Sequence, residues 1–148
     1  MTFFLCQSVQ DQLIYIGTEG RNTADQLIQM REAMGPVFAA GAVDRMVFDC
    51  REMTGHALNG SVARAILVAN NHALERAWVG TPLRLRLALM AEPGSPGRGV
   101  CRLLTGHAYD LDRLTMQMMS TEDEAAEFFG IDGGWPDRLV PLDPATLA

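Results

Sequence analysis

Lysine is missing from this sequence: all twelve basic residues are arginine, and eighteen acidic residues outnumber them. A Walker-type phosphate loop needs its lysine, and Schiff-base catalysis needs a lysine amine, so the chain can support neither. The formal net charge of -6 at pH 7 repels a phosphate backbone. We therefore do not expect nucleic acid to be a partner.

Cysteine is scarce, and long apolar runs are absent. Cys6, Cys50 and Cys101 are too few and too far apart for a disulfide framework or for paired zinc ligands. No two histidines have the i, i+4 spacing that holds a metal on one helical face. No stretch reaches the ~18 apolar residues of a membrane-spanning helix, and the N-terminus lacks the basic flank of a signal peptide. We expect a cytoplasmic protein with no transmembrane segment, no metal and no cofactor.

What the sequence does contain is the composition of one folded domain. It has 148 residues, of which 48% are hydrophobic and 20% charged, so it can bury a core without disulfide or metal. Short apolar segments predict strands at 3–9, 13–18, 45–50, 81–91 and 114–119. Helix-capping residues followed by apolar spacing predict helices that begin near residues 23, 61, 95 and 121. We expect Gly35-Pro36 to end or kink the first helix, and residues 51–60 to form a polar turn.

The predicted order of elements is β-β-α-β-α-β-α-β-α, an opening hairpin followed by alternating helices and strands. Such alternation favours parallel pairing, so the predicted fold class is α/β with a mixed, mostly parallel sheet. We assign residues 1–131 to this domain. Residues 132–148 contain three of the seven prolines and are expected to form an extended or loosely packed tail.

Four stretches carry a resemblance to a known family: the opening hairpin, the strand end at 47–51, the strand at 85–91, and the closing strand and helix at 116–129. Over residues 3–131 their arrangement resembles the STAS, or SpoIIAA-like, domains, which include anti-anti-sigma factors and a Sec14-like branch. The resemblance implies a SpoIIAA-like sheet with helices mainly on one side. It also implies a role in regulation or apolar-ligand binding more often than in catalysis.

One element of that family differs here. Anti-anti-sigma factors carry an Asp-Ser-Ser-Gly element at the start of the helix after the central strand, where a kinase phosphorylates a serine. The corresponding stretch in this chain is His56-Ala-Leu-Asn-Gly-Ser61. Ser61 lies close to the phosphorylated position of the family, although its neighbours do not match. A phosphorylation-dependent partner switch near Ser61 is therefore one alternative for the function.

Polar residues gather where the predicted parallel strands end, which is where open α/β sheets bind their ligands. The candidate ligand-binding residues are Asp49, Arg51, His56, Asn59, Ser61 and Arg98. Each also has an ordinary structural explanation. Asp49 can pair with Arg51, Asn59 or Ser61 can cap the following helix, and Arg98 can be solvated within a glycine-rich turn.

Catalytic motifs are few, so we expect a non-catalytic regulatory or ligand-binding module that forms a homodimer. Its further partner would be a protein or a small apolar or anionic ligand. Methionines such as Met30, Met34 and Met116 offer adaptable apolar surface on the first helix and last strand. We expect an apolar groove there, with a polar rim that includes Asp49, Arg51 and His56. The enzymatic alternative is a small hydrolase or isomerase in which His56 is the base and Asp49 orients it.

Overall fold

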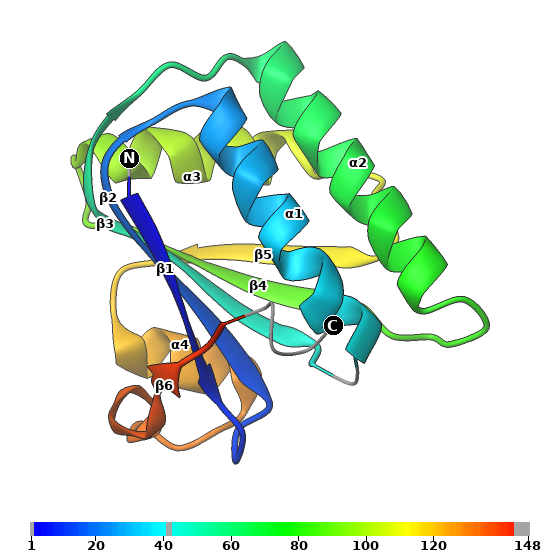
Figure 1. Ribbon diagram of the computed structural model, residues 1–148. Helices are drawn as coiled ribbons and strands as arrows, with labels where there is room; N and C mark the ends of the chain where they lie inside the picture. Colours follow the sequence, from blue (N-terminus) through cyan, green and yellow to red (C-terminus); the bar gives the residue numbers. More distant parts are fainter. Residues whose placement is uncertain (1, 41–42, 144–148) are drawn as a thin grey trace.

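The computed structural model describes residues 2–40 and 43–143. Their helices and strands follow the predicted order, with a short 3-10 helix and a two-residue strand added near the end (Figure 1). In chain order the elements are β1 (Thr2–Ser8), β2 (Leu13–Asn22), α1 (Ala24–Ala40), β3 (Arg45–His56), α2 (Gly60–Ala77), β4 (Leu85–Met90), α3 (Pro96–His107), β5 (Leu114–Met119), α4 (Glu122–Phe129), η1 (Trp135–Arg138) and β6 (Val140–Pro141). The predicted α/β fold class is confirmed.

The six strands form one mixed sheet with the spatial order β5-β4-β3-β2-β1-β6. β1 and β2 form the expected antiparallel hairpin, in which Ser8 pairs with Leu13 beside the turn. The pairs β2/β3, β3/β4 and β4/β5 are parallel, because the helix after each strand returns the chain to the same end of the sheet. β6 pairs antiparallel with β1. The mixed, mostly parallel sheet predicted from the sequence is confirmed.

Helices cover both faces of the sheet. Figure 1 shows α1, α2 and α3 on one face, and α4 with η1 on the other. Side chains of β3 alternate between the two layers: Met46 and Phe48 pack beneath α1 to α3, whereas Val47 packs with Phe129 of α4 and Trp135 of η1. The central strand is therefore buried on both sides, as a continuous apolar run predicts.

α1 begins with the predicted capping box. Thr23 Oγ1 accepts a hydrogen bond from the Gln26 N–H at 3.4 Å, and Gln26 Oε1 accepts one from the Thr23 N–H at 3.1 Å.

The first helix, α1, does not end at Gly35-Pro36 but continues to Ala40. Proline disfavours helical backbone at the preceding residue by clashing with its Cβ, and Gly35 has none. The glycine therefore lets the helix continue past Pro36.

β3 is longer than the strand predicted at 45–50, because β2 pairs with it as far as His56. The prediction of a polar turn at 51–60 is wrong for residues 51–56. Two register shifts, opposite Gly17/Glu19 and opposite Gly20/Arg21, each give β3 one residue more than β2. Such bulges keep a strand paired while they change which side chains face each layer. Residues 51–56 are therefore a strand in spite of their polar side chains, because their backbone pairs with β2.

Residues 132–143 lie against the sheet. β6 pairs with Cys6 and Gln7 of β1, and Trp135 is only 1% exposed. Arg138 forms an ion pair with Asp11, in the turn between β1 and β2, at 2.8 Å. This part of the tail is more closely packed than the sequence suggested. Residues 144–148 of the predicted tail lie outside the described residues, and the domain boundary at residue 131 stays a prediction.

Candidate functional site

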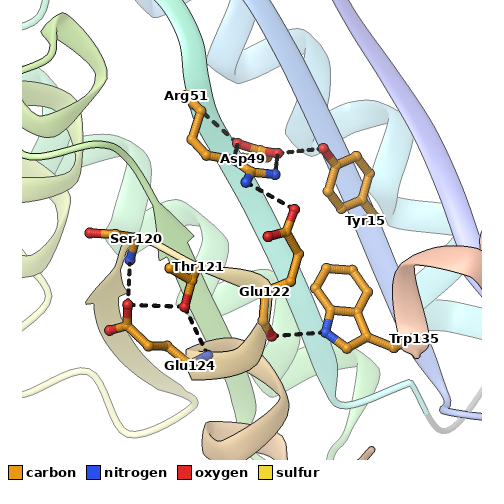
Figure 2. Close-up of polar contacts among 8 residues, drawn as sticks. All are labelled: Tyr15, Asp49, Arg51, Ser120, Thr121, Glu122, Glu124 and Trp135. Atoms are coloured by element: carbon orange, nitrogen blue, oxygen red, sulfur yellow. Dashed lines mark hydrogen bonds and ion pairs between the residues drawn. The ribbon is translucent and has the colours of Figure 1, made fainter. Parts of the chain in front are cut away.

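Asp49 and Arg51 stand two residues apart on β3 and form a bidentate pair (Figure 2). Arg51 donates hydrogen bonds to Asp49 Oδ1 from Nε at 3.0 Å and to Oδ2 from Nη2 at 2.8 Å. The Arg51 backbone N–H donates a further bond to Oδ1 at 3.0 Å. The hydroxyl of Tyr15 on β2 donates to Oδ2 at 2.5 Å. Arginine and carboxylate groups bind most strongly in this bidentate geometry.

The same cluster ties α4 and η1 to the sheet. Arg51 Nη1 lies 2.9 Å from Oε1 of Glu122, the first residue of α4. The backbone carbonyl of Glu122 accepts a hydrogen bond from Trp135 Nε1 at 3.1 Å. The predicted capping box holds the start of α4, since Thr121 Oγ1 accepts a bond from the Glu124 N–H. Figure 2 shows the cluster joining β2, β3, α4 and η1.

The contacts between Asp49 and Arg51 favour the ionised form of both side chains. Burial acts to raise the pKa of Asp49, but hydrogen bonds from Arg51 and Tyr15 outweigh it and keep that pKa below its ordinary value. The hydrogen bonds to Asp49 raise the pKa of the Arg51 guanidinium. Burial, and then the hydrogen bond to Asp49, raise the pKa of the Tyr15 hydroxyl. A carboxylate with a depressed pKa and with both oxygens engaged is a poor general base, so the cluster is suited to clamping α4 against the sheet.

His56 lies at the end of β3 and packs against α3, on the other face of the sheet from Asp49. A Cβ added at Gly99 of α3 would lie 3.1 Å from His56 Nε2. His56 Nδ1 accepts a hydrogen bond from the Leu58 N–H at 3.3 Å. Within residues 2–40 and 43–143 no hydrogen bond or ion pair joins His56 to Asp49. The fold does not assemble the pair that a hydrolase or isomerase would need.

Asn59 and Ser61 lie at the start of α2. Asn59 is the N-cap residue, and its Oδ1 accepts a hydrogen bond from the Val62 N–H at 2.9 Å. This is the capping role that the sequence offered for it. Ser61 lies in the first helical turn and is exposed. Asn59 is exposed as well, but its side chain is engaged as the helix cap, whereas the hydroxyl of Ser61 is accessible to modification.

Arg98 lies in the first turn of α3, after the glycine-rich turn. Ser95 and Pro96 are the N-cap and first helical residue, as predicted. A Cβ at Gly97 would collide with the backbone carbonyl oxygen of Cys50 on β3. Glycine at this position is required by the close approach of α3 to β3, which explains the residue without an anion. Arg98 is half-buried and makes no ion pair with any residue that the structure describes.

An apolar cavity of about 110 Å³ lies between the sheet and helices α1 and α2. The predicted apolar surface contributes to it through Met30 and Met34 of α1 and Met116 of β5. The cavity is lined by Ile16, Leu27, Met30, Arg31, Met34, Gly35, Phe38, Met46, Phe48, Ile66, Leu67, Asn70, Ala73, Leu74, Leu85, Leu87, Leu104, Leu114 and Met116. Its mainly apolar lining is suited to an apolar ligand.

The six residues predicted to bind ligand do not line this cavity. The predicted polar rim is therefore not its rim, because Asp49 and Arg51 face α4. The polar side chains that do line it are those of Arg31 on α1 and Asn70 on α2. Sequence reasoning missed both residues. The position of Arg31 in the sequence was the signal that could have identified it, since Arg31 follows Leu27 by four residues on the apolar stripe of its helix.

Comparison with protein-family models gives no match, and comparison with curated protein sequences gives no significant match. Solved structures with a similar fold do exist. The structure of the anti-sigma factor antagonist SpoIIAA in its unphosphorylated form is 18% identical in sequence, with a TM-score of 0.56, and the match covers 88% of this chain and 99% of that chain. The phosphorylated form of the Bacillus cell fate determinant SpoIIAA is 17% identical, with a TM-score of 0.48, and the match covers 85% and 97%.

A likeness at 18% identity concerns the fold, so the homodimer, the ligand and the site residues remain predictions. In the described part of the chain, no helix combines the length and apolar character needed to cross a bilayer. Three observations support the same fold: the element order, the mixed sheet, and a structural match that covers nearly the whole SpoIIAA chain. The chain therefore has the SpoIIAA-like fold that its sequence pattern resembles.

Proposed function

We propose that this chain is a non-catalytic regulatory module that binds an apolar ligand between the sheet and helices α1 and α2. The observation that carries the proposal is the cavity there, whose lining is apolar except for Arg31 and Asn70. Ligand sites are typically apolar concavities with a few polar groups that fix orientation. SpoIIAA is an anti-sigma factor antagonist, and from its fold we extend to this chain a regulatory role exerted through a protein partner.

The size of the cavity suits a compact apolar group. A dry cavity of about 150 Å³ lined by aliphatic and aromatic side chains binds benzene, and this cavity measures about 110 Å³. Part of its lining is supplied by Met30, Met34, Met46 and Met116. Unbranched methionine side chains adapt to the shape of a ligand at little cost. A neutral molecule of about the size of benzene is therefore expected to enter with modest rearrangement.

Filling the cavity is expected to abolish this binding. Ala73→Leu adds an isopropyl group at a residue of α2 that lines the cavity. Benzene at 100 times its Kd is expected to stabilise the wild-type protein by about 2.7 kcal/mol, and Ala73→Leu is expected to lose this effect. Differential scanning calorimetry with and without benzene measures it.

The matched control is Ala65→Leu, an exposed position on the same helix, which is expected to keep the full response to benzene. A wild-type melting temperature that does not change with saturating benzene would contradict the proposal. So would a benzene response that Ala73→Leu retains in full.

A partner switch at Ser61 is a second candidate function. Ser61 is exposed in the first turn of α2, immediately after β3, close to the serine that is phosphorylated in the family the sequence resembles. The SpoIIAA structure with the higher TM-score is described as the unphosphorylated form. A phosphate on Ser61 would lie at the positive end of the α2 dipole, where negative charge is favourable.

Negative charge at Ser61 is accordingly expected to stabilise the fold. Ser61→Asp should raise the free energy of unfolding by about 0.3–1 kcal/mol. Ser61→Asn introduces an uncharged side chain of nearly the same shape as aspartate, and it should give less of this gain. Urea denaturation at low ionic strength measures both. Intact-mass spectrometry of the protein purified from its native cells is expected to detect a phosphate that Ser61→Ala removes. If the phosphate is missing, or remains in Ser61→Ala, the second candidate fails.

A further inference from the structure

The polar groups of the apolar cavity lie on two facing helices. Arg31 lies on the face of α1 that also carries Leu27 and Met34 into the lining, and Asn70 lies on the corresponding face of α2. α1 and α2 pack against each other, and both side chains line the same cavity. A cation and an amide therefore stand at one cavity that is otherwise apolar.

Neither group is fully satisfied by the protein. Asn70 Oδ1 is buried without a hydrogen-bond partner, and leaving such an atom unpaired costs roughly 1–3 kcal/mol. Within the described residues, Arg31 makes no ion pair or hydrogen bond. Arg51 and Arg138, by contrast, are tied to the fold by ion pairs with Asp49 and Asp11. The unused donors and acceptor at the cavity are available to a ligand.

We infer that the ligand is an apolar carboxylate, whose carboxylate pairs with Arg31 and whose hydrocarbon chain fills the cavity. This inference rests on the proposed function of the cavity. A guanidinium presents paired N–H donors that match both oxygens of a carboxylate. Rotation of the Asn70 amide by half a turn exchanges Oδ1 for Nδ2, which can then donate to the same carboxylate. An ammonium ligand would be repelled by Arg31, and a neutral ligand would leave the guanidinium without a counter-ion.

The volume limits the length of the hydrocarbon chain. About 110 Å³ is smaller than a cavity that holds benzene, so it accommodates on the order of five carbon atoms before the methionines must move. Hexanoate has a chain of this length and a carboxylate that is ionised at neutral pH. Its neutral counterpart, 1-hexanol, has the same number of carbon atoms without the charge. The two probes therefore separate the contribution of the charge from that of apolar burial.

Isothermal titration calorimetry of the full chain at pH 7.5 tests the inference. Hexanoate is expected to bind wild-type protein at least about tenfold more tightly than 1-hexanol, a difference of 1.4 kcal/mol. Arg31→Gln is expected to remove this preference by weakening hexanoate binding about tenfold or more, while it leaves 1-hexanol binding within about twofold. Arg102→Gln, an exposed arginine on α3, is the matched control and should leave both affinities unchanged.

The outcomes separate this inference from the proposed function. If 1-hexanol and hexanoate bind equally well and Arg31→Gln changes neither, the carboxylate inference is overturned while the apolar-ligand function stands. If neither probe binds and benzene also fails to stabilise the protein, both are overturned. Arg31→Met provides a second uncharged variant with a long side chain, should Arg31→Gln be poorly folded.

Discussion

Trp135→Ala is expected to lower the free energy of unfolding by about 3–5 kcal/mol, the range for deleting a buried large aromatic side chain. Trp135 is 1% exposed and packs with Val47 and Phe129 between the sheet and α4. Its indole Nε1 donates a hydrogen bond to the Glu122 carbonyl at 3.1 Å. The substitution removes both the packing and this side-chain hydrogen bond to the start of α4. Urea denaturation followed by circular dichroism measures the loss.

A truncated chain and an exposed control extend this test to the domain boundary. Val140→Ala, at a residue that is 50% exposed, should change stability by no more than about 0.5 kcal/mol. A chain that ends at residue 131 lacks Trp135 and also Arg138, the ion-pair partner of Asp11. We expect it to lose at least as much stability as Trp135→Ala. A truncated chain of wild-type stability would instead support a domain that ends at 131, and would show that the tail contributes little.

The elements that were predictable from the sequence are those with local signals. The strand at 114–119 has the bounds of β5, and the capping boxes at Thr23 and Thr121 start α1 and α4 as expected. A cap, a turn and an apolar period are each set by residues within a few positions of one another. Their order along the chain was sufficient to predict a mixed, mostly parallel sheet, because parallel strands need crossover helices.

The packing of the tail depends on contacts that are distant in sequence. Trp135 lies in a Gly-Gly-Trp-Pro stretch that has no periodic pattern, and its partners Val47 and Phe129 belong to other elements. The one local signal was its size, because a large aromatic side chain in a polar segment gains most from burial. The proline content of residues 132–148 indicated an extended segment. It does not indicate whether such a segment packs against the rest of the domain.

The candidate site was predictable only where its members are neighbours in the chain. Asp49 and Arg51 are two residues apart, and their pairing was one of the expected explanations. The turn predicted at 51–60 does not fix the direction of the His56 side chain. In the structure His56 belongs to β3 and pairs with β2, and its side chain points toward α3. Arg31 and Asn70 meet at the cavity only because α1 and α2 pack together over the sheet. No local pattern joins residues 39 positions apart.

Arg51→Met is the second change expected to have a large effect, because it leaves the carboxylate of Asp49 buried without its cation. The Asp49 side chain is 8% exposed and that of Arg51 is 24% exposed. Removing one member of a buried pair costs about 3–5 kcal/mol. Since Arg51 is partly solvated, we expect about 3 kcal/mol at pH 7, measured by urea denaturation. The Arg51→Met, Asp49→Asn double variant removes both charges and should be more stable than Arg51→Met alone.

The pH dependence distinguishes this charge effect from a loss of packing. In the wild-type protein the pKa of Asp49 is lowered on folding, so its contribution is complete above the unfolded pKa of about 3.9 and is lost as the pH falls through the lower, folded pKa. In Arg51→Met, burial without a cation raises the pKa of Asp49, so protonation relieves the unpaired charge as the pH falls. The stability difference between the two proteins should therefore narrow between about pH 6 and pH 3. A difference that stays constant over this range would show that Arg51 acts through packing alone.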